Sequence, residues 1–309
     1  MTATPVGSGQ ADLRGQAWLR RSVTGRTNRS GLMLCSSGRT TGPGRCQWAH
    51  RQSESLDEGS SQRQAARNGG LRRPFIQNPD PHAKPDRRAP LADFVRRGDK
   101  RGLLALLMLH TIISSGDHDD GWSSTLHLKV WARALDTVST ASGTSATSAA
   151  TKILSRLVDR RLIKRRRTGR ERNVTITLLS ADGTGKAYTR PTGATPADRF
   201  IRLNHRFWTE DWAQTLTLPA IVMLLVALHE KPGFTLPTEH MPSWYGWSPD
   251  TAERGLRELE GRGVVRIGKQ VFTDPISPSG LSSRNVYTVL PPFDIASVDK
   301  DAAHAKSRR

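Results

Sequence analysis

The densest concentration of reactive side chains in this 309-residue sequence is a cationic run between positions 160 and 172, where Glu171 is the only acid. Guanidinium and ammonium groups neutralise phosphates, and arginine also enters narrow minor grooves. Runs of charged residues often only face solvent, so two interpretations of this run stay open: a solvated surface and a phosphate-binding site. Alternation along a strand indicates that only some of these cations face a ligand. The candidate phosphate-binding residues are Lys164, Arg165, Arg166, Arg167, Arg170 and Arg172.

A helix with a small, polar start precedes this run. The stretch SATSAATKILSRLVDRRL predicts a helix from about Ser145, with a buried stripe formed by Ala150, Ile153, Leu154, Leu157 and Val158. Short polar side chains near the start of such a helix can approach base edges closely, although they can equally cap and solvate it. The candidates for contact are Ser145, Thr147, Ser148, Thr151, Lys152 and Arg156.

A second helix of related design begins at Ser248, in SPDTAERGLRELEGRGVV. Serine is a favoured N-cap and proline is favoured at the first helical position, so we expect Ser248 and Pro249 to start the helix. Its candidate contact residues are Thr251, Arg254 and Arg257. Glutamates lie among these arginines at helical spacing, so an intrahelical ladder of ion pairs is an equally good interpretation.

The sequence lacks the motifs of common catalytic sites. It contains no phosphate-cradling Gly-Lys-Ser loop, no metalloprotease histidine pair and no Gly-x-Ser-x-Gly motif. Cys35 and Cys46 alone cannot form a four-ligand zinc site, and the acidic loop 117–120 lacks the pattern of a calcium loop. We therefore expect no enzymatic activity, no cofactor and no bound metal.

Composition indicates a polyanionic partner. The chain has 47 Lys and Arg against 28 Asp and Glu, a formal net charge of +19. No apolar run approaches the roughly 18 residues of a membrane-spanning helix, and the first residues lack the apolar core of a secretory signal. We therefore expect a cytoplasmic protein with no membrane association whose partner is nucleic acid.

Changes in composition divide the chain into five segments. We expect a disordered basic leader (1–96), a first domain (97–180), a flexible linker (181–198), a second domain (199–292) and a disordered tail (293–309). The leader is interpreted either as an arm that tracks DNA or as arbitrary coding sequence upstream of the native start. In each domain the residue pattern predicts helices followed by a hairpin. The predicted fold class is therefore mainly α with small β-hairpins, an α+β fold. Four tryptophans of the second half, Trp208, Trp212, Trp244 and Trp247, are expected to fill a core or a seam between domains.

The stretches SAATKILSRLVDRRLIKRRR and SPDTAERGLRELEGRGVVRI resemble the recognition helix and wing of winged helix-turn-helix DNA-binding proteins. Two such modules in one chain are similar to plasmid replication initiators and to some bacterial transcription regulators. This resemblance implies sequence-specific binding of double-stranded DNA, as an initiator of plasmid or mobile-element replication or as a regulator. The alternative is a tandem winged-helix adaptor that binds proteins in a chromosome-segregation or replication complex. A homodimer, the target sequence and an effector ligand are left open.

Overall fold

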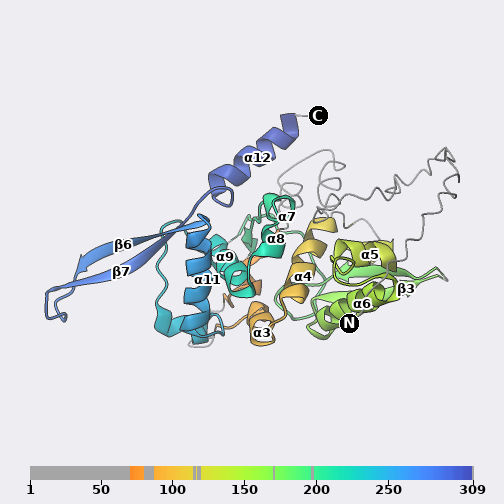
Figure 1. The fold of residues 1–309 in the computed structure, drawn as a ribbon, viewed down its shortest axis with the longest axis horizontal. Helices are drawn as coiled ribbons and strands as arrows, with labels where there is room; N and C mark the ends of the chain where they lie inside the picture. Colours follow the sequence, from red (N-terminus) through yellow and green to blue (C-terminus); the bar gives the residue numbers. More distant parts are fainter. Residues whose placement is uncertain are drawn as a thin grey trace, which may run out of the picture. The chain divides into compact units, whose positions relative to one another are not determined.

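The computed structural model describes residues 70–79, 87–113, 116, 120–169, 171–195 and 198–307. All of them belong to one compact unit, Gly44–Arg309. Helices and small antiparallel sheets alternate along the chain, which confirms the predicted mixed α and β class (Figure 1). The prediction of disorder for residues 1–69 lies outside the described residues.

Ordered structure begins before residue 97, where the leader was expected to end. Strand β1 (Leu71–Arg72), a 3-10 helix η1 (Arg73–Phe75) and helix α3 (Pro90–Arg96) lie within the predicted leader. Leu71, Phe75, Ile76, Leu91 and Phe94 are fully buried. The prediction of disorder is wrong for these residues, because a few apolar side chains without periodicity contribute to a core built by distant segments.

The first half of the fold combines three helices with a three-stranded antiparallel sheet. Its elements are α4 (Lys100–Ile112), β2 (Ser123–His127), α5 (Leu128–Ala134), α6 (Gly143–Asp159), β3 (Ile163–Thr168) and β4 (Asn173–Leu178). The strand order is β2–β4–β3, which leaves β3 at an edge of the sheet. The Asp99 carboxylate caps α4 by accepting a hydrogen bond from the Gly102 N–H at 2.9 Å.

The segment predicted to be a flexible linker packs against the rest of the fold. Ala181, Tyr188 and Arg190 are buried, and Arg72 forms an ion pair with Asp198 at 2.8 Å. Strand β5 (Phe200–Ile201), just beyond it, pairs antiparallel with β1. The prediction of flexibility is therefore wrong for Ala181, Tyr188, Arg190 and Asp198, whose long-range contacts the composition did not indicate.

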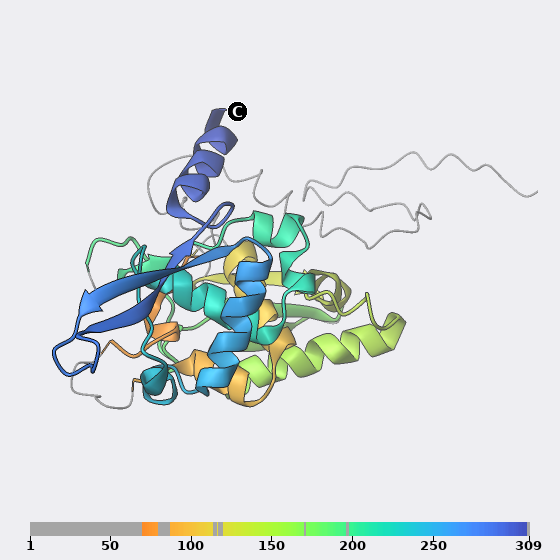
Figure 2. The same ribbon diagram turned by 60° about the vertical axis from the view of Figure 1, so that its left-hand side comes forward.

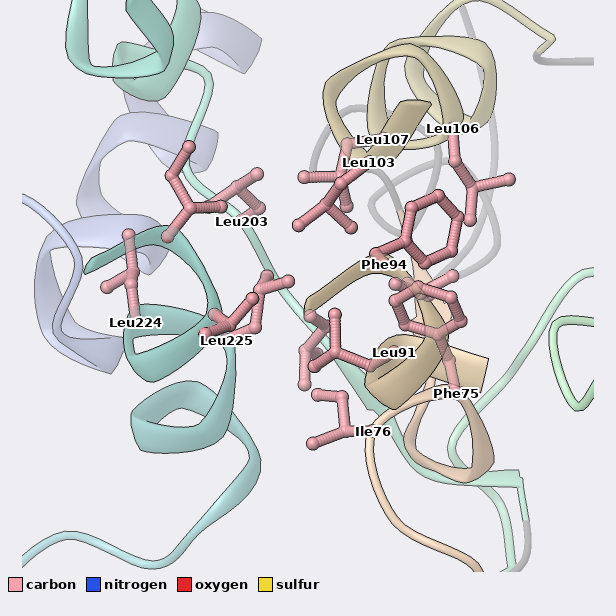
Figure 3. Packing of buried hydrophobic residues seen from close by; sticks show 14 of the residues in the cluster. Phe75, Ile76, Leu91, Phe94, Leu103, Leu106, Leu107, Leu203, Leu224 and Leu225 are labelled. Carbon is pink, nitrogen blue, oxygen red and sulfur yellow. The ribbon is translucent and has the colours of Figure 1, made fainter. Parts of the chain in front are cut away.

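The two predicted domains share one buried core. Side chains of α3 and α4 and of helix α9 (Leu218–His229) belong to the same apolar cluster. Figure 3 shows Leu225 of α9 facing Leu91 of α3, and the members of the cluster from the three helices that it labels are Leu91, Phe94, Leu103, Leu106, Leu107, Leu224 and Leu225. Trp208 and Trp247 are buried in the same cluster, Trp212 and Trp244 pack against it, and the expectation that the tryptophans fill a core is confirmed.

The second half begins with two short helices, and from α9 onward it again has helices followed by a hairpin. Its elements are α7 (Arg206–Thr209), α8 (Trp212–Thr215), α9, a 3-10 helix η4 (Thr238–His240), α10 (Met241–Trp244), α11 (Pro249–Gly261), β6 (Val265–Thr273) and β7 (Leu281–Val289). Phe234 forms a single antiparallel bridge to Tyr287 of β7. It therefore occupies the position that β2 holds beside β4.

A helix follows where a disordered tail was predicted. Helix α12 (Ile295–Ser307) begins after Phe293, which is buried, and also buries Val298. The Asp301 carboxylate accepts hydrogen bonds from Asn204 and from Arg206, both at 2.9 Å. The prediction is wrong because polar residues of this segment have partners far away in the sequence.

Close packing of α11 on α9 makes Gly255 a sensitive position. A Cβ atom added there would lie 2.4 Å from the Pro219 carbonyl oxygen and 2.7 Å from Met223 Cγ. We expect Gly255→Ala to lower the free energy of unfolding by about 1–3 kcal/mol, as overpacking typically does. Gly261→Ala in the same helix meets no atom within 4 Å, and should raise stability by up to about 1 kcal/mol. Urea unfolding of both variants is the measurement, and equal effects would contradict the packing argument.

Candidate nucleic-acid interface

Helix α6 presents a polar face because its apolar residues recur at helical spacing. Ala146, Ala150, Ile153, Leu154 and Leu157 are buried, whereas Thr144, Ser145 and Ser148 of the N-terminal turns are exposed. Val158, predicted for the buried stripe, is 37% exposed. The Thr137 hydroxyl lies within 2.9 Å of the carbonyl oxygens of Ala132 and Ala146, which fixes the loop between α5 and α6. The start of α6 is therefore held in place.

The predicted contact residues of α6 separate into exposed and occupied side chains. Ser145, Ser148 and Lys152 are exposed. Thr151 is half-buried and donates its hydroxyl to the Thr147 carbonyl. Thr147 is only 8% exposed and donates to the Thr144 carbonyl, so its expected surface role is wrong. The reason is helical spacing, which places position 147 on the same side as the buried positions 150 and 154.

Arg156 belongs to an ion-pair network inside the fold. Its Nε and Nη2 atoms donate to the Asp99 carboxylate at 3.0 and 2.9 Å. Arg160, part of the cationic run, pairs with Asp99 and with Asp93 at 2.8 Å in each case. Its guanidinium also lies 4.3 Å from the centroid of the Phe94 ring. Arg156 is therefore engaged with Asp99, a partner that its local sequence does not reveal, while its side chain is 40% exposed and its contact with a ligand stays a prediction.

This network keeps both aspartates ionised. Burial would raise the pKa of Asp93, but hydrogen bonds from Arg160, Arg96 and Arg97 lower it to about 2. Burial likewise opposes ionisation of Asp99, yet hydrogen bonds from Arg156 and the Gly102 N–H hold the pKa of Asp99 below its ordinary value. The network therefore joins α3, α4 and α6 through charged groups.

The edge strand β3 carries four exposed cations in succession, Lys164, Arg165, Arg166 and Arg167. Arg165 and Arg167 lie opposite Ile176 and Val174 of β4, which are buried, so they share the face of the sheet that meets the helices. Arg165 donates to the Thr151 carbonyl at 3.1 Å, which places its guanidinium beside α6.

The other cations of this hairpin differ in their surroundings. Lys164 and Arg166 lie on the opposite face of the sheet, where Arg166 pairs with Asp120. Arg172 is exposed at the turn, and Arg170 lies outside the described residues. Within the described part of the chain, Lys164, Arg165, Arg167 and Arg172 have no acidic partner. These four free cations differ in position: Arg165 and Arg167 lie on the face of the hairpin beside α6, Arg172 at the turn and Lys164 on the opposite face.

Two further cations were missed by the sequence interpretation. Lys129 and Arg133 are exposed on α5, the short helix that packs against α6. The His127 side chain caps this helix by accepting a hydrogen bond from the Lys129 N–H at 3.1 Å. Their spacing of four residues within HLKVWARALD was the available signal. They add positive charge to a helix adjoining the polar face of α6.

The predicted contact residues of α11 pair with acids of the same helix. Arg254 forms an ion pair with Asp250 at 3.0 Å, and Arg257 with Glu253 at 2.6 Å. Thr251 is half-buried beside the N-cap Ser248, whose Oγ accepts a hydrogen bond from the Thr251 N–H at 3.2 Å. The ladder of ion pairs, one of the two interpretations of this helix, is thus present.

Comparisons with protein-family models, curated proteins and solved structures find no match for this chain. Within the described ranges, no helix combines the length and apolar character required to cross a bilayer. Of the acidic loop 117–120, only Asp120 is described, and it pairs with Arg166.

Proposed function

We propose that this protein binds double-stranded DNA sequence-specifically through two winged helix-turn-helix modules in tandem, of which the first supplies most of the affinity. One observation carries the proposal: an exposed polar helix face lies beside an edge strand with four exposed cations. Phosphate contacts provide affinity, whereas side chains at base edges provide specificity. The first half of the fold offers both on adjoining elements.

The order of elements supports the winged-helix assignment. In the first half, the three helices α4, α5 and α6 precede the hairpin β3–β4, and β2 pairs on the outer side of β4. In the second half, α9, α10 and α11 precede the hairpin β6–β7, with Phe234 in the place of β2. A repeat of the same plan within one chain is what two tandem modules would produce.

The proposed binding mode follows from this geometry. The N-terminal turns of α6 enter the major groove with Ser145, Ser148 and Lys152 facing the bases, because small side chains permit close approach. The free cations of hairpin β3–β4 contact phosphates or an adjacent minor groove. Lys129 and Arg133 of α5 contact the backbone beside the groove.

The second module contributes differently. Residues 191–309 hold 14 basic and 13 acidic residues, and the arginines of α11 are engaged in ion pairs. We therefore expect the second half to bind phosphate weakly. Its surface supports a second candidate function, that of an adaptor that binds protein. For the whole chain we propose a role as a replication initiator of a plasmid or mobile element, or as a transcription regulator.

Sequence preference should depend on α6. We expect Ser148→Ala with Lys152→Ala to weaken binding to the preferred sequence by about 1–3 kcal/mol per lost base contact. The preferred sequence is obtained by enriching bound duplexes from a random pool. Lys231→Ala is the matched control, because this exposed lysine lies outside the proposed interface. Two results would refute the proposal that α6 recognises bases. One is a pool in which no sequence is enriched, and the other is an equal loss of affinity for the single variants Lys152→Ala and Lys231→Ala.

A further inference from the structure

The hairpin β6–β7 ends in an exposed apolar tip. Both strands have nine residues, and Figures 1 and 2 show the hairpin extending away from α9 and α11. Ile276, between Pro275 and Pro278 in the turn, is 93% exposed, and Val271 and Leu281 near it are more than half exposed. Exposed apolar side chains grouped at the end of a projecting element indicate a contact surface.

The tip is internally ordered, so the exposure of Ile276 is fixed by the turn. The Asp274 N–H donates to the Gly280 carbonyl at 2.9 Å, and the Ser277 N–H donates to the Asp274 carbonyl at 3.0 Å. The Ile276 N–H donates to the Asp274 carboxylate at 3.1 Å. The two prolines fix their own φ angles. The turn therefore holds the Ile276 side chain outward before any partner binds.

The strands behind this tip are cationic. Arg266, Lys269 and Arg284 are exposed on the hairpin, against a single carboxylate, Asp274. Hydrogen bonds from Ser282 and from backbone N–H groups satisfy that carboxylate and lower the pKa of Asp274. Arg284 lies over the Phe272 ring at 5.3 Å and donates to Gln270 at 3.0 Å, which fixes it along the strand. The hairpin therefore has positively charged strands, complementary to the phosphates of a duplex, and an apolar tip, complementary to its stacked bases.

We propose that the hairpin β6–β7 bends DNA, with Ile276 inserted as a wedge between two base pairs from the minor groove. Apolar side chains inserted in this way partly unstack a base step and kink the duplex toward the major groove. The strand cations Arg266, Lys269 and Arg284 would contact the phosphates on both sides of the kink. Flexible pyrimidine–purine steps would be preferred as the site of the kink. This inference rests on the proposed function and adds deformation of DNA to its recognition.

Ring closure of short DNA tests the proposal directly. Linear duplexes of about 100 base pairs, shorter than the persistence length of roughly 150 base pairs, close into circles inefficiently under DNA ligase. We expect the intact protein to raise the yield of circles about tenfold or more, because a kink brings the ends together. Ile276→Ser should return the yield nearly to that of DNA alone, while Ile276→Leu should retain most of it.

The control is Ile295→Ser, which removes an isoleucine that is 55% exposed outside the hairpin. Binding to the same linear duplex is measured in parallel for every variant, with sedimentation to give the oligomeric state. A protein that binds the duplex but closes circles equally with and without Ile276 would overturn the wedge and leave DNA binding intact. If Ile276→Ser only converts a dimer to monomers, the tip joins two copies and the proposal is wrong. Absence of duplex binding at low salt would refute the proposed function itself.

Discussion

Replacing Arg165, Arg167 and Arg172 by alanine is expected to lower the affinity for duplex DNA on the order of a hundredfold at about 0.1 M salt. Each cation that neutralises a phosphate releases counterions, so each lost contact flattens the plot of log affinity against log salt by about 0.9. Three losses should therefore change the slope by about three. Fluorescence anisotropy with a random-sequence duplex over a range of salt concentrations is the measurement.

The matched control removes the same charge from the second half. Lys231, Arg254 and Arg257 are exposed cations, and changing all three to alanine lowers the net charge equally. Because Arg254 and Arg257 are held by Asp250 and Glu253, we expect this variant to change the slope by less than about one. A similar change in both variants would mean that affinity depends on total charge and not on the hairpin beside α6.

Removal of the Asp99 carboxylate should be the most destabilising single substitution among those considered. Asp99→Ala is expected to lower the free energy of unfolding by about 3–5 kcal/mol, the usual result of breaking a buried ion pair by removing one partner. Arg160, whose side chain is 9% exposed, would keep only Asp93 as an acidic partner, Arg156 would lose Asp99, and α4 would lose its N-cap. Urea unfolding is the measurement. Asp120→Ala, which breaks the more exposed pair with Arg166, should cost about 1 kcal/mol or less.

Lowering the pH should reduce the difference in free energy of unfolding between Asp99→Ala and the unchanged protein. A carboxylate whose pKa is lower in the folded than in the unfolded protein stabilises the fold fully when the pH is above the pKa of the unfolded state. This stabilisation is lost as the pH falls through the pKa of the folded state. The ordinary pKa of aspartate is 3.8, and the pKa of Asp99 lies below it. The difference in stability should therefore remain constant above about pH 5 and shrink below about pH 4. A difference independent of pH would show that Asp99 acts through packing alone.

Local signals in the sequence predicted the helices that carry the candidate site. The Ser248–Pro249 start of α11 is confirmed, because N-cap chemistry depends only on neighbouring residues. The buried stripe of α6 is confirmed except at Val158, which is 37% exposed although the neighbouring Leu157 is fully buried. The hairpin β3–β4 also follows from local alternation.

Long-range partners could not be predicted from the sequence. Strand β1 has two residues and pairs with β5, more than a hundred positions away, so no periodicity reveals it. Arg156 differs from Lys152 because Asp99 lies against it, and that neighbour comes from the N-terminus of α4. The sequence therefore indicated where the positive charge lies, whereas the structure separates the cations engaged within the fold from those free to bind.

Site-specific photo-crosslinking tests most directly whether the face of α6 is the DNA interface. The full chain is prepared with a benzophenone amino acid at position 148, on the exposed face of α6, or at position 97, in the exposed turn between α3 and α4. Each protein is irradiated with a labelled random-sequence duplex at low salt. The account predicts protein–DNA adducts from position 148 and few or none from position 97. Equal adducts from both positions, or none from position 148 while the duplex is bound, would contradict it.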